Sequence, residues 1–438
     1  MQKIYVVSSI LFLTLSFLLY RHIPSEDAHF DIDSYGYQKL ALFFTQHKQM
    51  IDPECPLHAP VQPLGYPFFM GLVYSFFGVQ IPTLIFIQVL LMLASIMLLI
   101  YCTQQLFGAA AATIVGLLAA VNLGFLVYPQ FILAESLLLF VLMLAGALLL
   151  QYAQTGRTIV AVWAGFLFGC SLLIKPTALL LPIIMAPMIY RSEIESAYKK
   201  WQAIVLFMSA FALPPLIYTL RNYYLYGYFS FAPMMALNMY QCFLAKVIHQ
   251  ITGEPIQAVV DNQLRFTAIN SFDPAGWQRA QELFVTYLQD HPLTFAYVWM
   301  VNVIKTVCGL FTTQLKVLIE PQVQGGDCSF FLTTGTIGDR LYAYIESGIT
   351  HSWIRWAAWL EAGWMVLRTV LVAIGFWALL QEKKYGLLSI FVLCLILFCG
   401  VTGMDGCCRY RIVCEPFLSM ITAYALVRIG NKKRVEKL

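Results

Sequence analysis

Charged side chains are scarce in this sequence, since Asp, Glu, Lys and Arg make up only 11% of its 438 residues. A soluble globular chain carries roughly 25%. Hydrophobic residues account for 60%, and apolar runs recur along the whole chain. Crossing a ~30 Å hydrocarbon core takes ~20 helical residues, and several of these runs are that long. The composition therefore excludes an ordinary soluble protein and predicts an all-α polytopic membrane protein. The net charge of +4 is small and dispersed, so it indicates no nucleic-acid partner.

The sequence also lacks any C-x-x-C pair, although it contains eleven cysteines. This absence excludes a readable zinc or thioredoxin-like site. Six cysteines fall in apolar runs and are expected to be packing residues. The other five are expected in external loops, where they could form disulfides whose pairing the sequence does not give: Cys55, Cys242, Cys328, Cys407 and Cys408.

About ten transmembrane helices are predicted from the apolar runs between turn signals. The first run is expected to be a retained span, because no clean A-x-A cleavage site follows it. The expected spans are residues 4–20, 81–103, 110–128, 133–152, 158–174, 177–190, 203–220, 357–380, 386–403 and 412–429. Three regions follow: an N-terminal membrane module (1–220) with a first external loop (21–66), a loop region with interfacial helices (221–352), and C-terminal spans with a basic tail (353–438).

The distribution of charge predicts which side each loop occupies. With the N-terminus inside, the cytoplasmic segments hold twelve basic residues against four acidic ones. Because cytoplasmic loops carry an excess of Lys and Arg, both termini are expected in the cytoplasm and both long loops outside the cell (inner) membrane. The twelve bases are Lys3, Arg157, Arg191, Lys199, Lys200, Lys383, Lys384, Arg428, Lys432, Lys433, Arg434 and Lys437.

The segment Pro292–Ile319 is apolar enough to be an eleventh span, but a single crossing there would reverse the charge bias. We therefore expect an interfacial or re-entrant helix, with Lys305 and Lys316 reaching toward the membrane surface. Glu361 and Arg368 lie two turns apart in an expected span and are interpreted as a structural pair.

Two carboxylates, Asp31 and Asp33, begin the first external loop beside tyrosines. Such a pair at the membrane surface suits general base work or the binding of a cation. The alternative is structural, with Asp33 or Ser34 capping a helix over residues 35–44. Glu135 has no basic neighbour in its own turn, and an ionisable group at such a depth is usually paired or functional.

At five places in order, the chain resembles the bacterial branch of the GT-C glycosyltransferases, which contains protein O-mannosyltransferases and the lipid A aminoarabinose transferase. The resembling segments are Asp33–Tyr37 (D-S-x-x-Y), Gly65–Pro67 (G-Y-P), Glu135, Arg221–Gly227 (R-N-Y-x-x-x-G) and Arg409–Pro416 (R-Y-R-x-x-x-x-P). Family members with Asp-Glu in place of Asp-Ser are better known, and this departure leaves the use of a divalent metal open. No other cofactor is implied.

The resemblance implies an inverting membrane glycosyltransferase with a polyprenyl phosphate sugar as lipid donor and an external site. Asp33 would be the catalytic base, with Asp31 in reserve. Glu135, Tyr37 and Tyr66 would position the sugar or acceptor. Cations stabilise the charge that develops on a phosphate leaving group, and the candidates for this role are Lys175, Arg221, Arg409 and Arg411.

The sequence leaves the acceptor open between a lipid, a glycan and a protein. Two rival functions are a secondary transporter and a ligase or polymerase of lipid-linked oligosaccharides. A transporter would need ionisable or broken-helix sites near the bilayer midplane in two related halves, whereas the acidic residues here gather in loops on one side.

Overall fold

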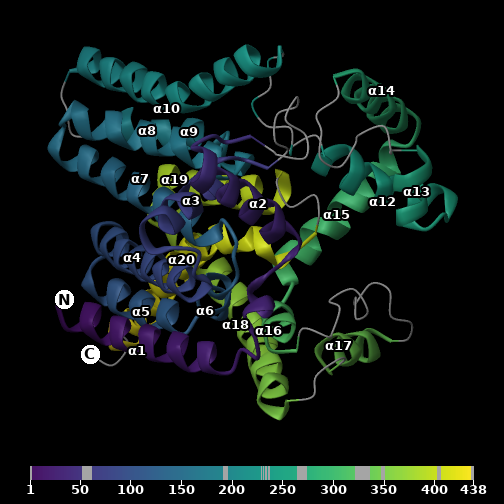
Figure 1. Ribbon diagram of the computed structural model, residues 1–438. Helices are drawn as coiled ribbons and strands as arrows, with labels where there is room; N and C mark the ends of the chain where they lie inside the picture. The colour runs from purple at the N-terminus through teal and green to yellow at the C-terminus, as the bar shows by residue number, and fades with distance from the viewer. Residues whose placement is uncertain are drawn as a thin grey trace.

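The computed structural model (Figure 1) describes residues 2–51, 62–190, 196–227, 237–263, 274–320, 336–346, 351–401 and 406–435, together with 229, 231 and 234. Helices dominate these residues, and no β-strand occurs among them. The all-α fold class is thus confirmed.

The N-terminal half contains ten α-helices and three short 3₁₀ turns. The α-helices are α1 (Gln2–Arg21), α2 (Ile32–His47), α3 (Gly65–Phe77), α4 (Ile81–Phe107), α5 (Ala109–Ala120), α6 (Leu123–Val127), α7 (Glu135–Thr155), α8 (Thr158–Ile174), α9 (Leu181–Tyr190) and α10 (Ala197–Tyr226). The 3₁₀ turns are η1 (Glu26–His29), η2 (Tyr128–Gln130) and η3 (Pro176–Ala178).

The remaining elements are likewise helical. The α-helices are α12 (Leu244–Thr252), α13 (Ile256–Gln263), α14 (Pro274–Asp290), α15 (Pro292–Cys308), α16 (Thr312–Ile319), α17 (Ile337–Glu346), α18 (Ser352–Gln381), α19 (Tyr385–Leu395) and α20 (Glu415–Val435). The described residues also include two π-helical turns, η4 (Leu237–Phe243) and η5 (Ile396–Val401), and one 3₁₀ turn, η7 (Cys408–Val413).

The long helices form a bundle in which α10 packs on α8, α8 on α7, α7 on α4, and α20 on α5 and α18. Figure 1 places both termini at one edge of this bundle, whereas α12, α13 and α14 form a lobe at the opposite edge that α15 joins to the bundle. Phe243, Phe284 and Phe295 contribute to the small apolar core of this lobe.

Small residues allow the closest helix contact in the bundle. A Cβ atom added at Gly165 of α8 would lie 2.2 Å from the Phe207 carbonyl oxygen of α10, and one at Gly169 would lie 2.4 Å from the Phe211 carbonyl oxygen. Spacing of four residues between two glycines is the pattern that lets membrane helices approach closely. α8 and α10 therefore pack backbone to backbone.

Five helices, α1, α4, α7, α10 and α18, are individually long and apolar enough to cross a membrane. The number rises to seven if two bent pairs each count as one span. These pairs are α5 with residues 123–130, bent by 52°, and α15 with α16, bent by 72°. All ten predicted runs coincide with helical segments, but α8, α9 and α19 with its π-turn are shorter apolar helices, so the count of ten remains a prediction.

The 72° bend between α15 and α16 replaces the straight eleventh span that apolarity alone would suggest. Lys316 does not reach toward the membrane surface as predicted. It is buried and donates hydrogen bonds to the carbonyl oxygens of Tyr344 (3.3 Å) and Ile345 (2.9 Å). The thiols of Cys242, Cys407 and Cys408 are free of disulfides, while Cys55 and Cys328 fall outside the described residues.

Topology can be tested by thiol labelling on intact cells. With cytoplasmic termini, Lys384→Cys in the turn after α18 should label only after the membrane is permeabilised, and Glu26→Cys should label from outside. The unsubstituted chain supplies the background from native thiols. External labelling at position 384 would contradict the predicted sidedness, which also places Lys199 and Lys433 inside and Asp273 and Asp405 outside; the last two lie outside the described residues.

Candidate functional site

Arg409 joins three carboxylates that are far apart in the sequence. Its Nη1 donates a hydrogen bond to Asp33 Oδ2 at 2.7 Å and lies 3.8 Å from Asp31 Oδ2. Its Nε donates to Glu135 Oε1, and its Nη2 lies 3.4 Å from Glu135 Oε2. The 3₁₀ turn η7 presents the guanidinium to the starts of α2 and α7.

Lys175 is the second cation of this site. Its Nζ donates to Glu135 Oε1 at 2.7 Å and lies 4.9 Å from the centre of the Tyr410 ring. It stands in extended backbone between α8 and η3, where Pro176 ends the helix. Since Glu135 is the one hydrogen-bond acceptor that Lys175 has among the described residues, two of its three N–H donors can bind another anion.

Burial differs sharply among the three carboxylates. The side chain of Glu135 is 1% exposed, whereas that of Asp33 is 30% exposed. Burial alone would lower the pKa of Arg409, but attraction to Glu135 and Asp33 outweighs it and holds that pKa well above its usual value. Three acids and two bases, Arg409 and Lys175, leave the cluster with one net negative charge. Glu135 thus anchors the cations, while Asp33 remains open to a substrate.

The two aspartates of α2 have different local roles. Asp31 is the N-cap: its side chain accepts from the Ile32 N–H at 2.8 Å and forms a capping box with Ser34. The structural alternative of a cap by Asp33 or Ser34 on a helix over residues 35–44 does not hold in that form, because the helix begins at Ile32 and Ser34 joins the capping box at its third position. Asp33 instead lies in the first turn with its carboxylate directed at Arg409.

A network of buried polar groups holds the segment that precedes Glu135. His29 Nδ1 lies 2.5 Å from the Gln130 carbonyl oxygen, and the Ser34 hydroxyl donates to the Ile132 carbonyl at 2.9 Å. Gln88 of α4 donates to the carbonyls of Pro129 (3.1 Å) and Phe131 (2.8 Å). Gln88 was not among the predicted site residues, although a lone amide in an apolar span is a signal of this kind of function.

Tyr37 and Tyr66 lie behind the charged cluster. Both are buried, their rings meet edge to face at 5.0 Å, and Tyr66 donates to Gln88 Oε1 at 2.6 Å. Burial, and then the negative charge of Asp33, raises the pKa of Tyr37 well above its usual value. Both tyrosines therefore pack beside the charged cluster. Their assignment to sugar or acceptor positioning stays a prediction.

Arg221 occupies a different place from the other predicted cations. Its guanidinium donates to the Met50 carbonyl oxygen and to Asn222 Oδ1, the latter at 2.8 Å, and lies beside the rings of Tyr218 and Tyr226. It thus ties the end of α10 to the chain beyond α2. A role for Arg221 in phosphate binding stays a prediction.

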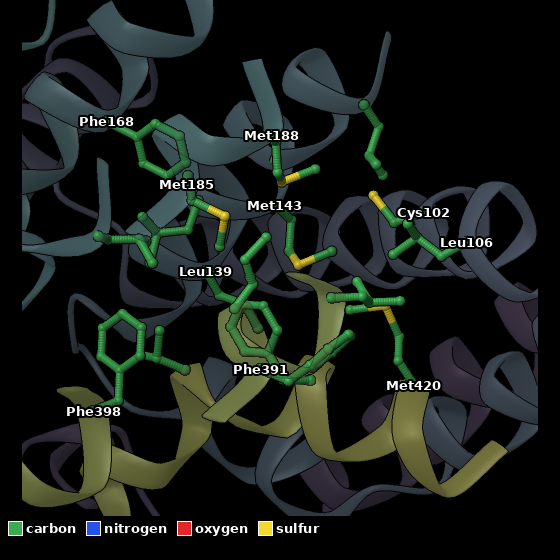
Figure 2. A pocket seen from close by; sticks show the side chains of 18 residues that line it. Cys102, Leu106, Leu139, Met143, Phe168, Met185, Met188, Phe391, Phe398 and Met420 are labelled. Atoms are coloured by element: carbon green, nitrogen blue, oxygen red, sulfur yellow. The ribbon is translucent and has the colours of Figure 1, made fainter. Parts of the chain in front are cut away.

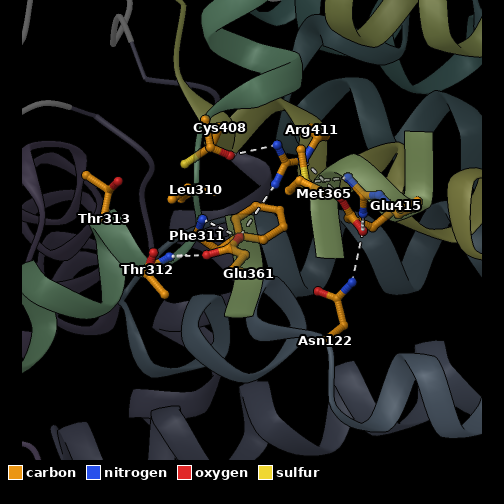
Figure 3. Close-up of polar contacts among 12 residues, drawn as sticks. Asn122, Leu310, Phe311, Thr312, Thr313, Glu361, Met365, Cys408, Arg411 and Glu415 are labelled. Atoms are coloured by element: carbon orange, nitrogen blue, oxygen red, sulfur yellow. Dashed lines mark hydrogen bonds and ion pairs between the residues drawn. The ribbon is translucent and has the colours of Figure 1, made fainter. Parts of the chain in front are cut away.

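Arg411 does not point toward Asp33, although it stands only two residues after Arg409. It is 1% exposed and donates from Nε to Glu415 at 2.9 Å. A 3₁₀ helix has about three residues per turn, so residues two apart face different directions. Its Nε and Nη1 are hydrogen-bonded inside the protein (Figure 3), so the two arginines face different surroundings, and a role for Arg411 in phosphate binding stays a prediction.

Glu361 and Arg368 do not pair with each other as predicted. Glu361 accepts hydrogen bonds from the N–H groups of Phe311 (2.7 Å) and Thr312 (2.9 Å), as Figure 3 shows. Arg368 donates to Glu415 Oε2 at 2.6 Å. Both belong to one buried network, in which Arg411 lies between Glu361 and Glu415, the partner of Arg368.

An apolar pocket lies between α4, α7, α8, α9, α19 and α20 (Figure 2). One end of the pocket approaches the charged cluster, because Leu139 follows Glu135 by one helical turn and Val413 ends the turn that carries Arg409. Methionines are frequent in its wall, and their flexible side chains adapt to irregular ligands. They are Met143, Met185, Met188 and Met420.

A divalent metal was left open by the sequence. Within the described residues, no group of three or more His, Cys, Asp or Glu side chains is arranged to hold a metal ion. The Arg409 guanidinium stands beside both Asp31 and Asp33, so these carboxylates face a protein cation.

Comparisons with known proteins give one family match. Residues 61–218 match the family described as dolichyl-phosphate-mannose-protein mannosyltransferase. No curated protein matches the chain by sequence.

Solved structures resemble the whole chain at low sequence identity. The oligosaccharyltransferase AglB of Archaeoglobus fulgidus, in complex with an inhibitory peptide and a dolichol-phosphate, has 13% identity and a TM-score of 0.55, covering 100% of this chain and 51% of that one. Its apo form gives 14% identity and a TM-score of 0.56 with the same coverage. The chain thus spans about half the length of these structures. ArnT from Cupriavidus metallidurans, bound to undecaprenyl phosphate, has 14% identity and a TM-score of 0.41, covering 96% of this chain and 77% of that one. The likeness in fold rests on the archaeal structures, whose TM-scores are higher.

The fold and the charged site define a multi-pass membrane protein whose catalytic candidates gather at the ends of its helices. Residues 61–218 are thus similar to the dolichyl-phosphate-mannose-protein mannosyltransferase family, and the whole chain shares the fold of the archaeal oligosaccharyltransferase.

Proposed function

We propose that this protein is a glycosyltransferase that moves a sugar from a polyprenyl-phosphate-linked donor to an acceptor on the extracytoplasmic face of the inner membrane. The observation that carries the proposal is the position of Arg409, which connects the accessible carboxylate of Asp33 to the buried carboxylate of Glu135 and, through it, to Lys175. One base and two cations are thus held within one cluster.

Asp33 has the environment that a general base requires. Its carboxylate is partly exposed and is held by a single hydrogen bond from Arg409. As the acceptor oxygen or nitrogen attacks the anomeric carbon, its proton passes to Asp33. The bond between that carbon and the phosphate oxygen breaks, and the electron pair leaves with the phosphate. A single displacement of this kind inverts the anomeric centre.

Arg409 and Lys175 are the candidates for stabilising the departing phosphate. Both are already paired with Glu135, and this pairing preorganises them before the donor arrives. Preorganised donors aimed at developing charge cost no reorganisation during the reaction. Lys175 retains two N–H donors for phosphate oxygens, so we assign it the first contact with the donor headgroup.

The apolar pocket supplies a place for the isoprenoid chain of the donor. One end of it lies next to Glu135 and η7, so a phosphate at Lys175 would direct the attached chain toward Leu139 and Val413. The archaeal oligosaccharyltransferase was solved with a dolichol-phosphate, a lipid of the same chemical class.

A bulky residue at Gly146 should test the occupant of the pocket. Gly146 lines the pocket, and a Cβ atom added there would meet no heavy atom within 4 Å. Gly146→Phe should therefore raise the KM for a long-chain donor by ~10-fold or more, because each excluded CH₂ forfeits ~0.8 kcal/mol of burial. Steady-state transfer from long-chain and short-chain donors is the measurement.

Matched substitutions separate pocket filling from other effects. Gly146→Ala leaves most of the pocket empty, and Gly363→Phe adds the same ring on an exposed face of α18 that is likewise open around its Cβ position. Neither should change the KM. An unchanged KM in Gly146→Phe would remove the isoprenoid chain from this pocket.

The function itself is tested with the purified protein in nanodiscs. Polyprenyl-phosphate-linked sugars and an extract of envelope lipids, glycans and proteins are supplied, and release of polyprenyl phosphate is followed by mass spectrometry. We expect release from one donor, in proportion to sugar gained by one acceptor. Folded protein that consumes none of the donors, together with an unchanged lipid-linked sugar profile in a deletion strain, would reject the proposal.

A further inference from the structure

Four charged side chains are buried together at a distance from Asp33. They are Arg411, Glu415, Glu361 and Arg368, each at most 7% exposed, and Asn122 donates to Glu415 at 2.9 Å. The described network has two positive and two negative groups. Replacing such a network by apolar residues is often neutral or even stabilising, so stability alone does not account for it.

The network fastens the elbow between α15 and α16. Arg411 Nη1 donates to the carbonyls of Val307 (2.6 Å) and Gly309 (2.7 Å), which are at the end of α15. Glu361 accepts from the first N–H groups of α16, and its Oε1 lies 3.9 Å from Arg411 Nη2 (Figure 3). Two carbonyl groups at the end of α15 and two N–H groups at the start of α16, which have no partner within their helices, thus each bond to a charged side chain.

Arg411 and Arg409 leave the same short turn in different directions. η7 is six residues long and packs against the elbow, where a Cβ atom added at Gly309 would lie 3.0 Å from the Cβ of Cys408. Displacing the turn on its Arg411 side therefore displaces the Arg409 guanidinium on its other side. A shift of ~1 Å in a catalytic group can cost ~10²-fold in rate.

We propose that Arg411 is a positioning residue, which with Glu361 locks η7 to the α15–α16 elbow and thereby sets where Arg409 meets Asp33 and Glu135. The inference rests on the proposed function for its kinetic consequence. Because α15 also carries the lobe of α12 and α14, the same lock relates that lobe to the candidate active site.

A readout without substrate tests the lock first. Cys408 in η7 and Cys102 in α4 are both buried. Arg411→Lys keeps the charge but loses the fork that reaches two carbonyls, so Cys408 should be alkylated at least several-fold faster while Cys102 stays protected. Mass spectrometry of the alkylated peptides resolves the two sites.

Two further variants sharpen this measurement. Arg368→Lys is matched in burial and in its bond to Glu415, but its partners are Glu415 and Met365 rather than the elbow carbonyls, so Cys408 should stay protected. Glu361→Gln keeps an oxygen acceptor but loses the charge, and should expose Cys408 to a smaller extent. Unchanged protection of Cys408 in Arg411→Lys, or equal loss at Cys102, would overturn the proposal.

Kinetics then separate positioning from a general structural effect. Arg411→Lys should lower kcat by ~10- to 100-fold with little change in donor KM, but should have no further effect in a chain that already carries Arg409→Lys. Equal proportional losses in both backgrounds would show that Arg411 does not act through Arg409. If the unsubstituted protein transfers no sugar, the proposed function fails, whereas the alkylation result still decides the lock.

Discussion

Replacing Arg409 by alanine is expected to lower the rate of sugar transfer by ~10²- to 10³-fold, the usual loss when one preorganised donor to a developing anion is removed. The variant removes the cation that Glu135 and Asp33 share. The rate is measured on purified protein with saturating donor, and the melting temperature is measured in parallel. Arg409→Lys should recover only part of the rate, since the planar fork that reaches two carboxylates is lost.

Arg428→Ala is the matched control for this experiment. Arg428 pairs with Glu382 at 2.6 Å near the turn between α18 and α19, so its loss removes a charge and an ion pair without touching the cluster. Its rate should stay within twofold of the unsubstituted protein, because exposed ion pairs contribute only ~0–1 kcal/mol. A normal rate in Arg409→Ala would remove this arginine from the catalytic site.

Asp33→Asn is expected to lower kcat by ~10² or more, because the amide keeps the shape of the carboxylate but cannot take up a proton. Binding of the donor lipid should persist, since the cations Arg409 and Lys175 remain. Turnover and donor affinity are therefore measured separately, and the loss should fall on turnover.

Asp31→Asn is the internal control for the base. Asp31 caps α2, and Asn caps a helix about as well as Asp, so this variant should keep most of its activity. Normal transfer by the Asp33 variant with an inactive Asp31 variant would move the base to Asp31. Full activity in both variants would reject the carboxylate mechanism.

Part of the site could be predicted because its residues belong to short patterns. Glu135, Lys175 and Arg409 each stand near a span end or a proline, Asp33 stands in the first external loop, and the structure brings all four together. The apolar runs likewise predicted where the helices lie, because an apolar run of ~20 residues has the length of a helix that crosses a bilayer.

Other features could not be predicted, because they depend on direction rather than on spacing. The R-Y-R motif does not indicate that Arg409 faces Asp33 whereas Arg411 faces the elbow between α15 and α16. The same limit applies to Glu361 and Arg368. Their helical spacing suggested a pair, but Arg411 of η7 lies between them. The role of Gln88 depends on carbonyls more than forty residues away.

The ion pair between Asp33 and Arg409 has a consequence for biosynthesis, since its partners are 376 residues apart in the chain. At ~5–20 residues per second of synthesis, Arg409 would leave the ribosome roughly 20–75 s after Asp33. From the synthesis of Lys175 until that of Arg409, the nascent protein holds Asp31, Asp33 and Glu135 with Lys175 as the single cation of the finished cluster. The five-residue cluster can therefore form only after Arg409 has been synthesised, so chains that terminate before the last helix lack it.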